Sequence, residues 1–152
     1  MTLSFIEHLA AACRKPINEP VFLEGYQEVL KGVAADGTFV VHGLTLTAPP
    51  GVYSPHETSS TRFVMDHFFG AGLTQPGGRL LEVGCGAGGI ALMAARHGWD
   101  VHACDIDPLA VAAATANAQR NGLALTAKQS DLFAAYSGEL FDVILFNQPF
   151  FH

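Results

Sequence analysis

The stretch RLLEVGCGAGG, residues 79–89, decides the fold, because a short apolar run passes directly into a cluster of glycines. The apolar run is typical of a buried β-strand, and GGIALMAARHG, residues 88–98, is predicted to form the helix that follows. Glycines at such a junction let the backbone turn sharply and let a ligand approach the main chain. The helix start offers free N–H groups to that ligand. A tight turn without a ligand is the alternative, and four glycines within residues 84–89 argue against it.

Strands and helices alternate after this motif. Apolar runs predict further strands at 100–105, 123–129 and 141–146, and an alanine-rich helix at 107–122 lies between the first two of these. Asp107 is expected to cap that helix, with Pro108 at its first position. Alternation of this kind implies right-handed crossovers and a parallel sheet. The sequence therefore predicts an α/β, Rossmann-like, doubly wound fold.

In the first half of the chain, the apolar residues follow other spacings. Helical spacing predicts helices at about 3–14 and 20–31, and TFVVHGLTLTA, residues 38–48, predicts two short strands about Gly43. A further helix is expected at about 57–69, with Phe63, Val64 and Phe68 facing the core. We expect residues 1–50 to be an extension of helices and a hairpin packed on the domain, with a small separate subdomain as the alternative. Residues 51–152 are expected to form the cofactor-binding half-domain.

The composition and charge of the chain limit the classes of partner and the cellular environment that we expect for it. The 152 residues are 49% hydrophobic and 14% charged, which suits one domain with a substantial core. No apolar run reaches the roughly 18 residues of a membrane span, and the first 20 residues lack the basic-then-apolar order of a secretory signal. Three cysteines and seven histidines lack metal-ligand spacing, so we expect no metal, no disulfide framework and a reducing cytoplasm. The formal net charge of −6, without a basic stripe, predicts that nucleic acid is an unlikely partner.

Acidic residues at strand ends indicate a nucleoside cofactor. Asp105 ends the second predicted strand of the alternating region, where a carboxylate can accept both hydroxyls of a ribose. Glu82 lies inside the first strand, where a charge is costly without a partner such as the amino group of a ligand. Gly84, Gly86 and Gly89 also satisfy the G-x-G-x-x-G pattern of dinucleotide-binding proteins, so a nicotinamide-binding oxidoreductase remains an alternative.

The pattern Glu82-x-Gly84-x-Gly86-x-Gly88 resembles the motif of class I methyltransferases that use S-adenosylmethionine, and residues 79–150 look like the first half of such a domain. The resemblance implies that S-adenosylmethionine is the cofactor and that Asp131 accepts from the adenine amino group, while the Leu132 N–H meets a ring nitrogen. A helix cap is an equally weighted alternative for Asp131. The cofactor-binding residues it implies within 79–150 are Glu82, Gly84, Cys85, Gly86, Gly88, Asp105, Ile106, Asp131, Leu132 and Asn147.

NQPF, residues 147–150, ends the fourth predicted strand of this region and resembles the Asn-Pro-Pro-Tyr/Phe motif of methyltransferases that act on nitrogen. The Asn147 side-chain oxygen and the Gln148 backbone carbonyl would each accept an N–H of the acceptor nitrogen and orient its lone pair. Pro149 would fix the direction of that carbonyl, and the Phe150 ring would pack on the planar acceptor group. Gln148 departs from the motif, in which a proline stands here. A simple strand-terminating turn is the alternative.

GVYSPHETSS, residues 51–60, resembles the VYxPxEDT segment of release-factor glutamine methyltransferases of the archaeal and eukaryotic type. It also resembles the PGVFS segment of ribosomal-RNA guanine N2-methyltransferases in the same small-domain superfamily. The resemblance implies that Tyr53 and Thr58 line the cofactor site. The alternative makes Tyr53 a core residue and Thr58 a partner of a helix cap.

These observations predict an S-adenosylmethionine-dependent N-methyltransferase. A protein glutamine is the first expected acceptor, a small-molecule amine the second and guanine N2 of ribosomal RNA the third. The alternatives are the NAD-binding oxidoreductase and a non-catalytic cofactor-binding scaffold.

The family sheet has the strand order 3-2-1-4-5-7-6, and this sequence predicts a sheet truncated after the fourth core strand. We therefore expect the 152 residues to be a fragment, or a partner chain or dimer to complete the sheet at Ile144. A fragment of this kind is expected to bind cofactor weakly and to catalyse nothing by itself.

Overall fold

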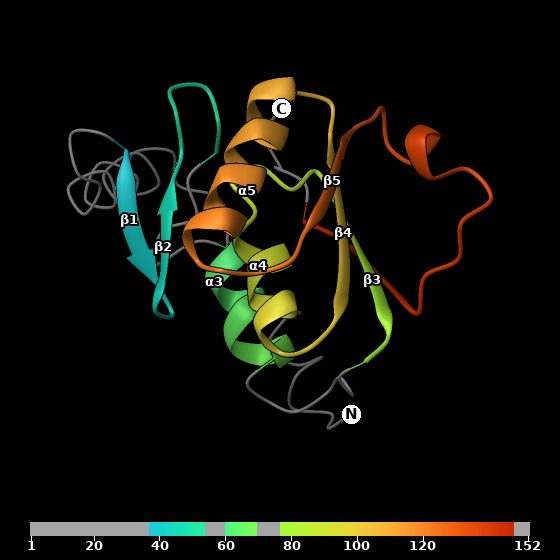
Figure 1. Cartoon of the computed structure of the whole chain (residues 1–152), viewed down its shortest axis with the longest axis horizontal. Helices are drawn as coiled ribbons and strands as arrows, with labels where there is room; N and C mark the ends of the chain where they lie inside the picture. Colours follow the sequence, from blue (N-terminus) through green and yellow to red (C-terminus); the bar gives the residue numbers. More distant parts are fainter. Residues whose placement is uncertain (1–36, 54–59, 70–76, 148–152) are drawn as a thin grey trace, which may run out of the picture. The chain divides into compact units, whose positions relative to one another are not determined.

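The computed structural model describes residues 37–53, 60–69 and 77–147 (Figure 1). All of them belong to one compact unit, Gly32–His152. The helices predicted at 3–14 and 20–31 lie outside the described residues, so they stay predictions.

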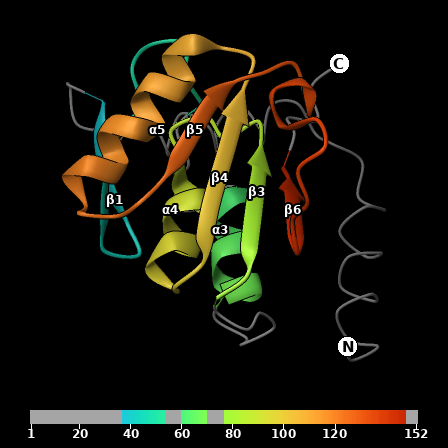
Figure 2. The same cartoon turned by 45° about the vertical axis from the view of Figure 1, so that its right-hand side comes forward.

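Four parallel strands form the central sheet, in the order β5-β4-β3-β6 (Figure 2). Their bounds are Arg79–Val83 for β3, Asp100–Asp105 for β4, Thr126–Gln129 for β5 and Val143–Phe146 for β6. The strand that precedes the glycines is therefore central, with its neighbours placed as in a doubly wound sheet. The predicted α/β class with a parallel sheet is confirmed.

Two helices connect the first three strands of this sheet. Helix α4, Gly89–Arg96, follows β3, and helix α5, Pro108–Arg120, follows β4. The Asp107 carboxylate accepts a hydrogen bond from the Leu109 N–H at 2.8 Å, which confirms Asp107 as the predicted cap. The connection from β5 to β6 contains a short 3-10 helix, η2, Ala134–Tyr136.

The strand side chains alternate between two cores, because successive residues of a strand point to opposite faces. One core joins β3 and β4 to α4, α5 and the N-terminal hairpin, and Leu80, Val101 and Ala103 belong to it. The opposite face carries a smaller cluster, in which Tyr136 and Phe141 pack on the sheet; its buried members from the strands are Leu81, Val83 and Cys104. Burial on both faces explains why β3 reads as a continuous apolar run.

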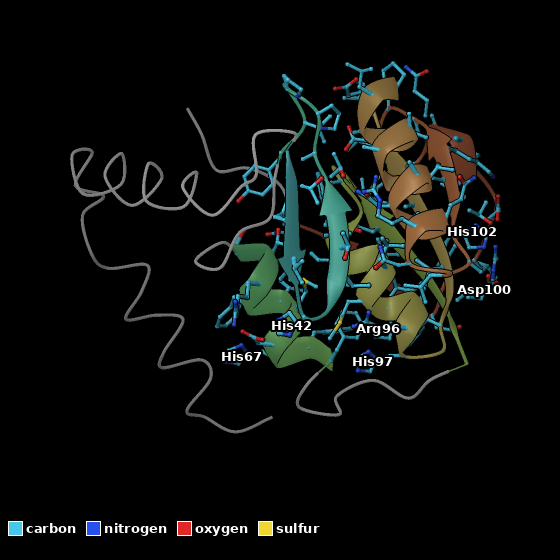
Figure 3. All side chains as sticks on the ribbon, turned by 60° about the vertical axis from the view of Figure 1, so that its left-hand side comes forward. His42, His67, Arg96, His97, Asp100 and His102 are labelled. Atoms are coloured by element: carbon cyan, nitrogen blue, oxygen red, sulfur yellow. The ribbon has the colours of Figure 1, made fainter. Side chains whose placement is uncertain are left out.

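The predicted hairpin is present as β1, Thr38–Val41, paired antiparallel with β2, Leu44–Thr47. His42 and Gly43 form its turn with positive φ angles of 48° and 71°, as a two-residue turn of this twist requires. Arg96, at the end of α4, donates to the carbonyl oxygens of His42 and Gly43 (Figure 3). The hairpin turn is therefore attached to the helix that follows the glycine loop.

The helix expected at 57–69 is described from Ser60. It begins as α3, Ser60–Val64, and widens into a π-helical turn, η1, Met65–Phe69. The prediction that Phe63 faces the core is wrong, because its side chain is 43% exposed and stacks on the His67 ring. Val64 and Phe68 pack against the core as predicted, and Met65 and Phe69 are buried beside them.

Strand β6 lies at the outer side of the described sheet, where it pairs with β3. The Ile144 side chain is 50% exposed there. Within residues 37–53, 60–69 and 77–147, no helix combines the length and apolar character that crossing a membrane requires.

Candidate active site

The carboxyl ends of the four parallel strands bring together residues from distant parts of the chain. Val83 of β3 pairs in register with Cys104 of β4 and with Phe146 of β6. The next residues along these strands therefore share one edge, and they are Gly84, Asp105 and Asn147. Gln129 of β5 pairs with Asp105, and Asp131 follows shortly after it. The structure places all four predicted strand-end residues at the edge where open α/β sheets bind ligands.

The glycine loop folds tightly over the end of β4. The N–H groups of Gly84 and Cys85 both donate to the Cys104 carbonyl oxygen, at 2.8 and 3.0 Å, and the Gly88 N–H donates to the Cys85 carbonyl oxygen at 2.8 Å. Positive φ angles, which favour glycine, occur at Gly84 (71°), Gly86 (52°) and Gly88 (83°). The three glycines that the motif singles out therefore stand where other residues would be strained.

Asp105 holds this loop from the neighbouring strand. One of its carboxylate oxygens accepts from the Gly86 N–H at 2.9 Å, and the other accepts from the Asp107 N–H at 3.0 Å. Each oxygen keeps a further lone pair. The carboxylate can therefore accept ribose hydroxyls while it keeps the loop in place.

Glu82 is buried, with an exposed fraction of 3%. Its Oε2 accepts a hydrogen bond from the Ala91 N–H in the first turn of α4, at 2.8 Å. Burial, helped by the nearby charge of Asp105, raises the pKa of Glu82 to about 8. The Ala91 N–H of α4 is thus one partner for the Glu82 carboxyl group. Ionisation of Glu82 still costs free energy, and a nearby cation would lower that cost.

The turn after β5 is organised by Ser130, a residue that no sequence motif singled out. The Ser130 hydroxyl accepts from the Ala135 N–H and donates to the Leu132 carbonyl oxygen, both at 2.9 Å. Leu132 has a positive φ of 47°, and Cys104 Sγ donates to the same carbonyl at 3.3 Å. The Ser130 side chain, rather than that of Asp131, therefore accepts from an N–H of η2. Asp131 is exposed, and within the described part of the chain its carboxylate has no hydrogen bond or ion pair.

Tyr53 lies against the glycine loop. A Cβ added at Gly86 would lie 3.5 Å from the Tyr53 carbonyl oxygen. The Tyr53 side chain is 45% exposed, so the alternative of a core residue is wrong. Ile106 is also exposed at this edge, directly after Asp105. Thr58 lies outside the described residues.

Asn147 is half-buried at the end of β6, and its Nδ2 donates to the Thr61 hydroxyl of α3 at 3.2 Å. This bond fixes the amide and leaves its oxygen to accept a hydrogen bond. Thr61 is buried. Its contact with Asn147 could not be predicted from a local sequence motif, because 86 positions separate the two residues. Gln148, Pro149 and Phe150 lie outside the described residues.

The two described cysteines are free and buried, and they are not nucleophiles. Burial raises the pKa of the Cys85 thiol well above its usual range and also raises the pKa of Cys104. Both thiols are therefore protonated at neutral pH, and the thiolate is the reactive form. In the three described segments, no three histidine, cysteine or acidic side chains lie together as metal ligands.

A glycine loop after the central strand, an acid at the end of the second and an asparagine at the end of the fourth are the arrangement of a class I methyltransferase. The model of the methyltransferase small domain family matches residues 43–152, and the chain belongs to this family.

Relatives of known activity are similar over the same region. Ribosomal RNA small subunit methyltransferase C of Chromohalobacter salexigens is 38% identical over 118 residues, which are 77% of this chain and 35% of the relative. Ribosomal protein L11 methyltransferase of Thermosipho africanus is 42% identical over 74 residues, which are 48% of this chain and 28% of the relative. The chain spans about a third of the length of the curated relatives it matches.

A solved structure agrees with this family. The 16S rRNA N2 G1207 methyltransferase of T. thermophilus, in complex with AdoMet and guanosine, superposes with a TM-score of 0.66 at 27% identity. The match covers 75% of this chain and 32% of that chain. The predictions of a class I methyltransferase and of S-adenosylmethionine as its cofactor are thereby confirmed, and the NAD-binding alternative is disfavoured.

Two predictions need correction. The resemblance to release-factor glutamine methyltransferases was too narrow, because the relatives with the longer matches are ribosomal RNA methyltransferases. The prediction that nucleic acid is an unlikely partner is wrong for the same reason. Net charge is a poor guide here, because it averages over the chain, whereas an enzyme that modifies a base can read that base inside a site without a basic stripe.

Proposed function

We propose that this protein transfers a methyl group from S-adenosylmethionine to the exocyclic N2 amine of a guanine in ribosomal RNA. The observation that carries the proposal is the Asn147 amide, oriented by Thr61 at the end of β6. This amide belongs to a chain that is similar to an rRNA guanine methyltransferase whose structure was solved with guanosine. A ribosomal substrate would also place the reaction in the cytoplasm.

The residues at the strand ends fit the cofactor by their chemistry. The Asp105 carboxylate would accept the ribose hydroxyls, and the exposed Asp131 carboxylate would accept from the adenine amino group. Ile106 and Leu132 offer exposed apolar surface for the adenine ring. The loop glycines would allow close approach, and Glu82 would favour the cationic amino group. When bound, S-adenosylmethionine supplies an electrophilic methyl group on a sulfonium.

The amine that accepts the methyl group must be oriented, and it has little need of a general base. The lone pair of an exocyclic amine is delocalised into its ring, so the free amine is a poor nucleophile. The Asn147 side-chain oxygen and the Gln148 carbonyl would accept its two N–H groups and turn the lone pair toward the methyl group. Such hydrogen bonds strengthen as positive charge develops on the nitrogen, so they lower the barrier rather than only binding substrate.

A protein glutamine, first in the order predicted from the sequence, is the second candidate. The same two acceptors would suit an amide nitrogen, and the similarity to a ribosomal protein methyltransferase favours a protein substrate. That similarity covers 48% of this chain, against 77% for the rRNA methyltransferase of C. salexigens. The longer match supports ribosomal RNA as the first candidate.

Methylation of 16S rRNA tests the proposal. The full-length protein is incubated with unmodified 16S rRNA transcript and, separately, with small ribosomal subunits and ribosomal proteins, using radiolabelled S-adenosylmethionine. Nuclease digestion and mass spectrometry should find N2-methylguanosine in the RNA. Asn147→Ala should lose this product. Label found in protein glutamine, with none in RNA, would refute the proposed substrate.

A further inference from the structure

Asn117 is a buried polar residue in the last turn of α5, with an exposed fraction of 1%. The face of the helix around it is formed by small apolar residues, and those that are buried are Ala110, Ala113, Ala114 and Ala118. An amide in such surroundings is costly unless its donors and acceptor are all used. The partners of Asn117 therefore show what the residue does.

Its amide joins two segments that are distant in sequence. Oδ1 accepts from the Thr47 N–H at 2.9 Å, and Nδ2 donates to the Thr47 carbonyl at 3.0 Å, so the side chain pairs with the end of β2 like a neighbouring strand. Nδ2 also donates to the Ala87 carbonyl of the glycine loop at 2.9 Å. One side chain thus holds the end of the hairpin and the glycine loop at a fixed separation.

Asn121 stands one helical turn further along and repeats half of this arrangement. Its Oδ1 accepts from the Thr45 N–H at 3.0 Å, and its Nδ2 donates to the Thr45 carbonyl at 2.8 Å. Its remaining hydrogen bond goes to the Asn117 carbonyl within α5, at 2.7 Å. Both asparagines therefore dock β2 on the helix, but Asn121 makes no hydrogen bond to the glycine loop.

The segment after Thr47 leads to Tyr53, which lies against Gly86 of the same loop. Residues 47–53 are therefore attached at their start to Asn117 and end in contact with the glycine loop. Gly88 is held from the same helix, because a Cβ there would lie 3.0 Å from the Ala114 Cβ. The loop is thus in contact both with α5, at Gly88, and with the end of segment 47–53, at Gly86.

We propose that Asn117 is a positioning residue that sets the spacing between residues 47–53 and the glycine loop, and thereby sets the affinity for the adenosyl cofactor. This inference rests on the proposed function. Asn121 fastens the hairpin without this effect on the cofactor site.

The matched pair Asn117→Ala and Asn121→Ala tests the inference. Each variant loses one side-chain pairing with β2, so both should lower the free energy of unfolding in urea. Isothermal titration with S-adenosylhomocysteine should show a Kd at least about tenfold higher for Asn117→Ala, the worth of one buried hydrogen bond. The Kd of Asn121→Ala should change less than about threefold. An equal change in the Kd for S-adenosylhomocysteine in the two variants would overturn the positioning role of Asn117.

Hydrogen exchange in the unaltered protein provides a second measurement that needs no variant to fold. Addition of S-adenosylhomocysteine should slow amide exchange in residues 47–53 and 84–88 together. Slowing confined to residues 84–88 would overturn the coupling. A protein that binds no S-adenosylhomocysteine at all would instead refute the proposed function, so the two failures are distinguishable.

Discussion

Glu82 shows how one buried carboxyl links the fold to its ligand. Its pKa is raised from 4.5 to about 8, so between these values the folded protein keeps a proton that the unfolded chain releases. Stability therefore falls as pH rises through this window and is not affected by Glu82 below it. The charge becomes tolerable only when a cation approaches, which suits a site for the amino group of the cofactor.

Replacing Glu82 by Gln should remove this pH dependence. The amide oxygen can still accept from the Ala91 N–H, but the side chain no longer titrates. The unfolding free energy of the natural protein should fall relative to that of Glu82→Gln by a few kcal/mol between about pH 5 and pH 8. Urea unfolding at both pH values measures the difference. A constant difference would show that Glu82 is ionised throughout.

Thr61 is expected to act through Asn147. Thr61→Val keeps the shape but removes the hydroxyl that accepts from Asn147 Nδ2, so the amide is free to turn. The methylation rate should fall about tenfold, the worth of one hydrogen bond. Thr61→Ser should restore most of it, and the Kd for S-adenosylhomocysteine should stay unchanged in both. A loss of cofactor binding in Thr61→Val would point to a general role in the fold.

At the scale of elements, the glycine loop depends on its contact with α5. Gly88 has a positive φ of 83° and touches Ala114, whereas Gly122 at the end of α5 has a positive φ of 65° with open space around it. An alanine at Gly122 would therefore meet backbone strain alone, whereas an alanine at Gly88 would meet both strain and crowding. Strain alone costs about 1 kcal/mol or more, and crowding in a packed interior adds about 1–3 kcal/mol.

Gly88→Ala should lower the unfolding free energy by about 2–4 kcal/mol, and Gly122→Ala by about 1 kcal/mol. Urea unfolding gives both values. Gly88→Ala should also weaken binding of S-adenosylhomocysteine, because the loop must move away from α5. If the two variants are equally stable, Ala114 does not constrain the loop.

The elements themselves were largely predictable. Apolar runs with glycine boundaries identified all four strands of the sheet, and Asp107 with Pro108 identified the start of α5. The π turn of η1 was not predictable, because its side chains follow a helical pattern whose widening depends on tertiary packing.

At the scale of the whole molecule, local signals identified strand-end residues but not the residues that hold them. Thr61 and Asn117 act through contacts with residues far along the chain, whereas the Ser130 hydroxyl bonds to residues within five positions of its own. The choice of partner failed for a different reason, because net charge is summed over the chain whereas recognition of a base is local. Relatives corrected that choice, since the site chemistry alone suits both an amide and an exocyclic amine.

The central claim is that the carboxyl edge of the sheet binds an adenosyl cofactor, and isothermal titration tests it most directly. We predict saturable heat with S-adenosylhomocysteine, no heat with NAD, and binding at least about tenfold weaker in Asp105→Ala, since that carboxylate would hold the ribose and holds the loop. Heat with NAD alone, or binding of S-adenosylhomocysteine unaffected by Asp105→Ala, would contradict the account.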